Sequence, residues 1–211
     1  MPTASRSELE RAAEHLAKND PHLAPIIKRA GLAAIKPHSN YYWELVDSII
    51  SQQLSVKAAA SIEKRFQELF DSEFPEPAAI LEKSVEELRA VGLSGAKARY
   101  VRDLAEHVLD GRLVLDNFDS MSNEEIITML TDVKGIGEWT AHMFLIFSLG
   151  RLDILPVGDL GIRNGIRALY SFEDIPTPQQ IKDLAAANNW APYQSVASWY
   201  VWHSLDNVPN V

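Results

Sequence analysis

The sequence contains no cysteine among its 211 residues. This absence excludes disulfide bonds, thiolate zinc sites, cysteine nucleophiles and iron–sulfur clusters. The longest apolar runs, such as residues 143–149, are far shorter than the ~20 residues that a membrane-spanning helix needs. No apolar segment typical of a secretory signal follows Met1. We therefore expect an intracellular protein.

Positive charge is also scarce. The chain has 20 Lys and Arg against 29 Asp and Glu, which gives a net charge of −9. This balance argues against a partner bound through a broad basic surface. One stretch without acidic residues is either a modest basic face or an ordinary solvated face, and its cations are Arg89, Lys97, Arg99 and Arg102.

The sequence lacks the alternating pattern of β-strands, and its apolar residues repeat at three- and four-residue intervals instead. Four serine or threonine residues precede a glutamate or glutamine by three positions, the pattern of a helix-capping box. These pairs are Ser7 with Glu10, Ser84 with Glu87, Ser122 with Glu125, and Thr177 with Gln180. The pattern predicts an all-α protein.

We expect helices near residues 6–18, 22–30, 40–53, 55–71, 76–82, 85–91, 95–110, 123–131, 137–149, 159–169, 178–187 and 191–205. The breaks between them are too short to be interdomain linkers. The predicted architecture is therefore a single two-lobed unit over residues 1–211, with a cleft between the lobes. One lobe spans about 40–115, and the other combines about 116–211 with the N-terminal helices.

Two glycines one residue apart mark a tight turn in the segment 133–137, Val-Lys-Gly-Ile-Gly. A helix is predicted to begin at Gly137, and the unpaired amides at the start of a helix form a site for a phosphate. Lys134 at the tip either adds a phosphate contact or is an ordinary surface lysine. The plainer interpretation of Gly135 is a helix cap between two packed helices.

Asp159 lies 20 residues beyond Trp139, after a turn that Pro156 and Gly158 predict. Its position is typical of a residue that caps the next helix. On its own this pattern indicates nothing more than a cap.

The segments 50–59, 92–98, 133–141 and 155–163 together resemble the helix-hairpin-helix DNA glycosylases, in particular the alkyladenine branch, DNA-3-methyladenine glycosylase II. The resemblance covers roughly residues 40–205. The chain differs from the longer members because only 40 residues precede Tyr41, so we expect no amino-terminal sheet domain. It also lacks the four-cysteine cluster of endonuclease-III-like members.

The resemblance implies a catalytic role for Asp159, which would stabilise the sugar cation and orient or deprotonate the attacking water. Members with lyase activity have a lysine nucleophile where this chain has Trp139, and an indole cannot form an imine. The implied enzyme is therefore a monofunctional DNA glycosylase that releases alkylated purines, such as 3-methyladenine and 7-methylguanine, in base excision repair. Its location would be the cytoplasm, with the nucleoid in a prokaryote.

The resemblance also assigns the remaining site residues. The base pocket would include Trp139, Tyr193 and Met143, and the DNA wedge would be Leu54 with Gln53 beside it. The phosphate-binding hairpin would comprise Lys134, Gly135, Ile136 and Gly137. A structural Na⁺ or K⁺ would bind the carbonyls of Thr131, Val133 and Gly135, with no cofactor for catalysis. The partner would be double-stranded DNA with a flipped damaged base, bound by a monomer.

Two alternatives remain open at this point. The first is a glycosylase for oxidised or deaminated bases, although no acid partner for a neutral leaving base is evident beside Asp159. The second is a DNA-binding protein without enzyme activity, in which Asp159 is only a helix cap. Leu54 has a competing core-packing interpretation, and we expect Trp199 and Trp202, three residues apart, to lie in the core.

Overall fold

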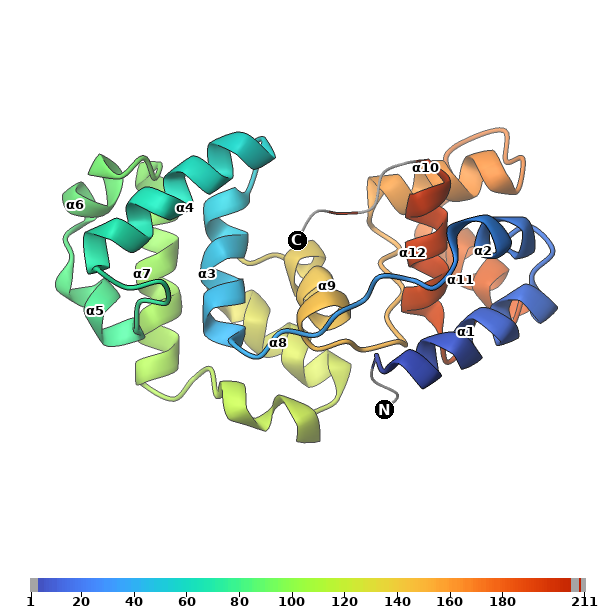
Figure 1. Ribbon diagram of the computed structural model, residues 1–211, viewed down its shortest axis with the longest axis horizontal. Helices are drawn as coiled ribbons and strands as arrows, with labels where there is room; N and C mark the ends of the chain where they lie inside the picture. The colour runs from blue at the N-terminus through green and yellow to red at the C-terminus, as the bar shows by residue number, and fades with distance from the viewer. Residues whose placement is uncertain (1–3, 206–208, 210–211) are drawn as a thin grey trace. The chain divides into compact units, whose positions relative to one another are not determined.

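The computed structural model describes residues 4–205 and 209, and within these residues it contains helices and no β-strand (Figure 1). The all-α prediction is confirmed. The α-helices are α1 (Arg6–Asn19), α2 (Ala24–Ala30), α3 (Tyr41–Ser51), α4 (Val56–Phe70), α5 (Pro77–Glu82), α6 (Val85–Ala90), α7 (Gly95–Leu109), α8 (Asn123–Asp132), α9 (Glu138–Met143), α10 (Leu160–Leu169), α11 (Pro178–Ala187) and α12 (Gln194–Ser204).

The chain forms two compact units. Unit 1 combines Met1–Pro37 with Leu145–Val211, and unit 2 comprises His38–Phe144. The division therefore falls after Phe144 and not near residue 115, where the sequence led us to expect it. Segment 116–144 stays in unit 2 because the buried Phe118 ring packs against both Tyr41 and Phe144, with centroid distances of 6.0 and 5.7 Å.

Helix starts follow the capping signals closely. The capping boxes at Ser84, Ser122 and Thr177 are all formed, with both reciprocal hydrogen bonds present. The prediction for Ser7 is wrong, because Ser5 caps α1 by accepting a hydrogen bond from the Glu8 amide at 3.2 Å. Ser7 lies within the first turn of that helix, so its hydroxyl cannot serve as the cap.

Two segments differ from the predicted secondary structure. The helix expected over 137–149 is regular only as α9, and a π-helical turn, Phe144–Ser148, follows it. A 3₁₀ helix, Leu115–Ser120, occupies part of what was predicted as a loop. It forms there because Phe118 is buried, which draws this segment against the core of unit 2.

Unit 1 is built around α12, whose residues from Ser195 to Trp202 are all buried. A helix that is buried on every side must be covered by other helices all round. Helices α1, α2 and α10 supply this cover. Gly165 allows the close approach of α10, because a Cβ there would lie 2.4 Å from Val201 Cγ1. The predicted core positions of Trp199 and Trp202 are confirmed.

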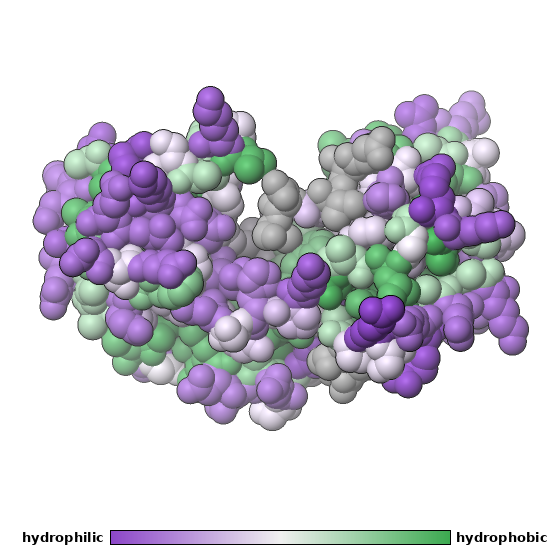
Figure 2. All heavy atoms as spheres, in the orientation of Figure 1, coloured by the Kyte–Doolittle hydropathy of each residue, from purple (hydrophilic) through white to green (hydrophobic). Residues whose placement is uncertain are grey.

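Unit 2 has its core between α3, α5 and α7. Leu45, Val46, Ile49 and Ile50 of α3 are fully buried, and α7 packs against both other helices. Hydrophilic side chains cover much of the visible face of this unit (Figure 2). Helix α7 packs against α3, α5 and α6 and so lies in the middle of the unit, where its side chains can reach loops on several sides.

Candidate functional site

The double-glycine segment joins α8 to α9 as a tight hairpin in unit 2. Val133 and Ile136 are buried and anchor it, and the Ile136 amide donates to the Val133 carbonyl at 3.1 Å. Gly135 has φ of +90°, and a Cβ there would lie 2.2 Å from the Tyr100 ring. Only glycine suits this position, because it tolerates both the backbone angle and the close approach.

The hairpin leaves two amides available for a ligand. Among the described residues, the amides of Gly135 and Gly137 donate no hydrogen bond to another protein group. A Cβ on Gly137 would meet no atom within 4 Å, so the space in front of this glycine is open. The amides of Lys134 and Ile136, by contrast, already have acceptors in unit 2. The geometry thus offers the two glycine amides to an anion.

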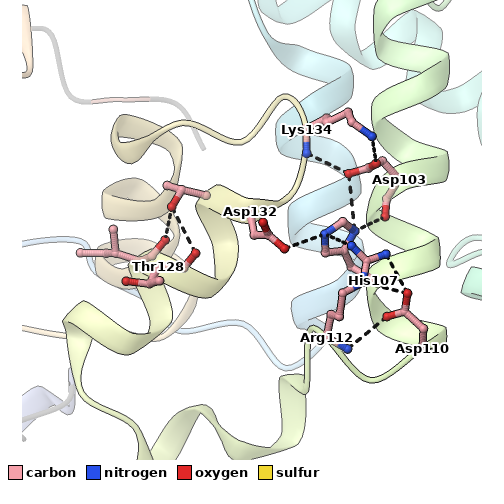
Figure 3. Close-up of polar contacts among 9 residues, drawn as sticks. Asp103, His107, Asp110, Arg112, Thr128, Asp132 and Lys134 are labelled. Carbon is pink, nitrogen blue, oxygen red and sulfur yellow. Dashed lines mark hydrogen bonds and ion pairs between the residues drawn. The ribbon is translucent and has the colours of Figure 1, made fainter.

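Lys134 is held by α7. Its ammonium lies 2.6 Å from Asp103 Oδ1, and its amide donates to Asp103 Oδ2 at 2.9 Å (Figure 3). Burial alone would raise the pKa of the Asp103 carboxyl, but these hydrogen bonds from Lys134 outweigh burial and hold that pKa below its ordinary value. The same contact raises the pKa of the Lys134 ammonium. Lys134 is therefore a tether of the hairpin in this structure.

A buried histidine lies behind this tether. His107 Nδ1 is 2.7 Å from the Asp103 carbonyl oxygen and acts as its donor, because Arg112 Nη1 donates to His107 Nε2 at 2.7 Å (Figure 3). Arg112 also contacts Asp110, and Asp132 of α8 lies 3.1 Å from His107 Nε2. The attraction between the Asp132 carboxylate and the Arg112 guanidinium connects the end of α8 to this cluster and thereby supports the hairpin.

The segment 52–55, which we term the wedge loop, joins α3 to α4. Gln53 has φ of +57°, in the left-handed region that non-glycine residues rarely adopt. Leu54 is 39% exposed, so the core-packing interpretation of this side chain is wrong. Figure 2 shows a hydrophobic area at the turn between α3 and α4, where Leu54 and Val56 are exposed.

Two cations of the stretch 89–102 act within the protein. Lys97 Nζ donates to the carbonyl oxygens of Ile50 at 2.8 Å and of Gln52 at 2.6 Å. Arg102 Nη1 donates to the carbonyls of Leu81 and Lys83. These side chains cap the ends of neighbouring helices, so the stretch offers fewer cations to a ligand than its composition indicates.

The candidate carboxylate lies in unit 1. Asp159 caps α10, and its Oδ1 accepts hydrogen bonds from the Ile162 amide at 2.7 Å and from Trp202 Nε1 at 2.8 Å. The predicted turn is present, since the Asp159 amide donates to the Pro156 carbonyl at 2.9 Å. Asp159 is 9% exposed, between the exposed residues Gly158 and Leu160. The carboxylate is thus fixed in orientation and close to the protein surface.

The family comparison agrees with this geometry. Residues 46–190 match the family described as HhH-GPD superfamily base excision DNA repair protein. The chain is 36% identical over 203 residues to DNA-3-methyladenine glycosylase 1 of Schizosaccharomyces pombe, covering 93% of this chain and 87% of that protein. The chain belongs to the HhH-GPD superfamily.

Solved structures give the same result. A DNA-3-methyladenine glycosidase from Bacillus halodurans superposes with a TM-score of 0.83 at 37% identity, covering 92% of this chain and 88% of that one. A Schizosaccharomyces pombe 3-methyladenine DNA glycosylase in complex with abasic DNA superposes with a TM-score of 0.78 at 35% identity. The match covers 93% of this chain and 97% of that one. The match extends over nearly the whole length of both chains.

The predicted pocket residues of this HhH-GPD protein are in three different settings. Trp139, in the first turn of α9, is 46% exposed. Met143, at the end of the same helix, is buried and only 3% exposed. Tyr193 precedes α12 in unit 1, and its hydroxyl donates to Glu8 Oε1 at 2.9 Å. Their assignment to a base pocket stays a prediction.

The sequence-based prediction missed three residues that contact the candidate site. Trp202 was assigned only to the core, yet it binds the Asp159 carboxylate. Gln52 Nε2 donates to the Gly135 carbonyl at 2.8 Å, and Asp103 binds Lys134. No local spacing could reveal these pairs, because their members lie 43, 83 and 31 residues apart in the chain.

Within the residues that the structure describes, no group of three or more histidine or acidic side chains could hold a metal ion. The same residues include no helix long and apolar enough to cross a membrane.

Proposed function

We propose that this chain is a monofunctional DNA glycosylase that hydrolyses the N-glycosidic bond of alkylated purines in base excision repair. The Asp159 carboxylate carries the proposal, because it is held by two hydrogen bonds at the start of α10. Support also comes from relatives named DNA-3-methyladenine glycosylase, whose length this chain spans almost completely.

The chemistry needs only one carboxylate. A purine alkylated at N3 or N7 carries a positive charge and departs as a neutral base, so a strong general acid is unnecessary. Asp159 stabilises the positive charge that develops on the sugar and orients or deprotonates the attacking water. The hydrogen bonds from Ile162 and Trp202 hold Oδ1 in place, so the carboxylate does not have to reorganise during the reaction.

Base release without strand cleavage follows from the residue at position 139. A lyase step requires an amine that forms an imine with the sugar, and Trp139 has none. Its half-exposed ring instead offers a face on which a cationic base can stack.

The DNA partner is bound as a duplex by a monomer. The amides of Gly135 and Gly137 bind a backbone phosphate, and Leu54, with Gln53 beside it, fills the gap that the flipped base leaves. Lys134 contributes through its tether to Asp103.

A monovalent cation is part of this proposal. Its ligands would be the carbonyl oxygens of Thr131, Val133 and Gly135. The carbonyls of Val133 and Gly135 each accept one hydrogen bond, from Ile136 and Gln52, and a carbonyl oxygen has a second lone pair for a cation. A bound Na⁺ or K⁺ would add positive charge next to a phosphate.

Chromatographic identification of the bases released from methylated DNA tests the proposal. The wild-type protein should release 3-methyladenine and 7-methylguanine and leave the strand uncut. Asp159→Asn should slow release by at least about 100-fold, because the side-chain amide keeps the helix cap but lacks the charge. Asp174→Asn, at an exposed residue of unit 1, is the matched control and should leave the rate unchanged.

The competing functions give different outcomes. Release of 8-oxoguanine or hypoxanthine in preference to methylated bases would identify a glycosylase for oxidised or deaminated DNA. Duplex binding without release of any base would identify a non-enzymatic DNA-binding protein. If Asp159→Asn released bases at the wild-type rate, the assignment of Asp159 as the catalytic carboxylate would be wrong.

A further inference from the structure

Three residues that project from one helix support the two DNA-binding loops of unit 2. Lys97, Tyr100 and Asp103 follow one another at intervals of three along α7. Lys97 binds the wedge loop, the Tyr100 ring lies against Gly135, and Asp103 binds Lys134. The wedge loop and the hairpin therefore share one support.

Gln52 connects the two loops directly. Its backbone carbonyl accepts a hydrogen bond from Lys97 Nζ at 2.6 Å, and its side-chain Nε2 donates to the Gly135 carbonyl at 2.8 Å. One residue of the wedge loop is thus held by α7 through its backbone and by the hairpin through its side chain. Neither contact uses Gln53 or Leu54, the residues assigned to the DNA wedge.

The wedge loop needs this support. Gln53 has φ of +57°, a conformation that is unfavourable for a residue with a side chain unless its surroundings impose it. Lys97 is partly withdrawn from water, and this burial lowers the pKa of its ammonium. Its hydrogen bonds to the Ile50 and Gln52 carbonyls offset the water that the ammonium has lost.

We propose that Gln52 and Lys97 are positioning residues that hold the wedge loop in register with the hairpin, so that Leu54 is placed to enter the base stack once the hairpin has bound the DNA backbone. This inference rests on the proposed function, since it assumes that the protein flips a base out of duplex DNA. Gln52 and Lys97 act through the loops they hold and not by touching the reacting atoms.

The experiment uses duplex DNA with 2-aminopurine at the target position, because the fluorescence of this adenine analogue rises when it leaves the base stack. Gln52→Met and Lys97→Met remove the hydrogen bonds and keep much of the side-chain bulk. Gln67→Met is the matched control for the first, because Gln67 also donates from its amide to a backbone carbonyl, that of Glu73. Lys64→Met on α4 is the matched control for the second, since Lys64 is 78% exposed.

With saturating protein, both test variants should show at most about half of the wild-type fluorescence rise and should release methylated bases at least about fivefold more slowly. Their affinity for an undamaged duplex should stay within about twofold of wild type, because the hairpin amides are unchanged. Both control variants should behave like wild type in all three measurements.

A double-mutant comparison tests whether Gln52 acts through the wedge. Leu54→Ala should reduce the fluorescence rise much less in the Gln52→Met background than in wild type, because the wedge is already misplaced. Additive effects of the two substitutions would overturn the proposal. So would a wild-type fluorescence rise in both Gln52→Met and Lys97→Met, or a loss of affinity for undamaged duplex as large as the loss of rate.

Failure of this inference is distinguishable from failure of the proposed function. If the wild-type protein releases no base, the proposed function fails, while the fluorescence and affinity measurements still decide whether Gln52 and Lys97 control the wedge. Thermal unfolding shows which variants fold. Lys97→Arg keeps a donor for the two carbonyls and should restore most of the fluorescence rise, a recovery that a general packing defect would not show.

Discussion

The two units hold their candidate residues in opposite ways. In unit 2 the hairpin and the wedge loop lie at the surface, and side chains of α7 bind them from behind. In unit 1 the Asp159 carboxylate is mostly buried and is bound by a tryptophan of the central helix α12. Binding a DNA backbone requires amides that face outward, whereas stabilising a developing charge requires a carboxylate that is fixed and largely shielded from water.

Glycine serves both units, for different reasons. Gly135 permits a left-handed backbone over the Tyr100 ring, which shapes a loop. Gly165 permits close helix packing, because a Cβ there would lie 3.1 Å from the Val201 carbonyl oxygen. Since α10 begins beside Asp159 and α12 carries Trp202, this packing helps to bring the two together. One glycine shapes a binding loop, and the other sets the position of a charge.

The largest expected effect is that of Gly135→Ala on unit 2. We expect the free energy of unfolding to fall by roughly 2–4 kcal/mol, because the substitution combines an unfavourable φ with a clash against Tyr100. Urea denaturation measures this change. The matched variant Gly137→Ala has φ of −96° and open space around its Cβ, so it should leave stability nearly unchanged and weaken DNA binding alone. Equal destabilisation by both variants would contradict the difference between the two glycines.

In unit 1, Trp202→Phe should slow base release by about 10–100-fold, because a hydrogen bond to a charged group contributes about 1.5–3 kcal/mol. Single-turnover kinetics measure this effect, and affinity for DNA should not change. Trp190→Phe is the matched control, since Trp190 Nε1 donates to Asp20 Oδ2 at 2.7 Å elsewhere in the same unit. If Trp190→Phe slowed release as much as Trp202→Phe, the contact with Asp159 would have no special role.

A smaller effect concerns the acidic side chains of unit 2. Burial, with the nearby charges of Glu63 and Glu44, raises the pKa of Asp47 from 3.8 to about 6. The folded state therefore binds this proton more tightly than the unfolded state, and the ionised carboxylate destabilises the fold above about pH 6. Asp47→Asn should raise the free energy of unfolding by about 1–2 kcal/mol at pH 7. This is less than the full pKa shift corresponds to, because the Asp47 side chain is partly exposed and solvent screens its charge.

The gain from Asp47→Asn should disappear as the pH falls toward 4, where the wild-type carboxyl is protonated in the folded state. Urea denaturation at a series of pH values measures it. Asp119→Asn, at an exposed residue of the same unit, should show no such dependence. A gain that is independent of pH would mean that titration of Asp47 is not its source.

The smallest expected effect is that of Lys134→Met on the salt dependence of DNA binding. A lysine that contacts a phosphate contributes about 0.9 to the slope of log K against log salt. Because the Lys134 ammonium binds Asp103, we expect the slope to change by much less than this value. Measurement of duplex affinity over a range of salt concentrations shows whether Lys134 contacts a phosphate or only holds the hairpin to Asp103. A decrease of about 0.9 would show that Lys134 leaves Asp103 to contact DNA.

Local signals predicted most of the fold. Three of the four capping boxes formed, and the turn before Asp159 and the cap at its helix were found where the sequence placed them. The break after α9 was missed, since a helix and a π-helical turn have nearly the same apolar pattern. The hydrogen bonds of Trp202, Lys97 and Asp103 were also missed, because tertiary packing and not local sequence brings their partners together.

The path of the chain through the units has a consequence for synthesis. All residues of unit 2 are continuous, from His38 to Phe144, so this unit is complete as soon as Phe144 has left the ribosome. Unit 1 must wait, because α1 and α2 are made first and α12, against which they pack, is made last. A nascent chain therefore acquires the loops assigned to holding DNA before it acquires α12, whose Trp202 holds the Asp159 carboxylate.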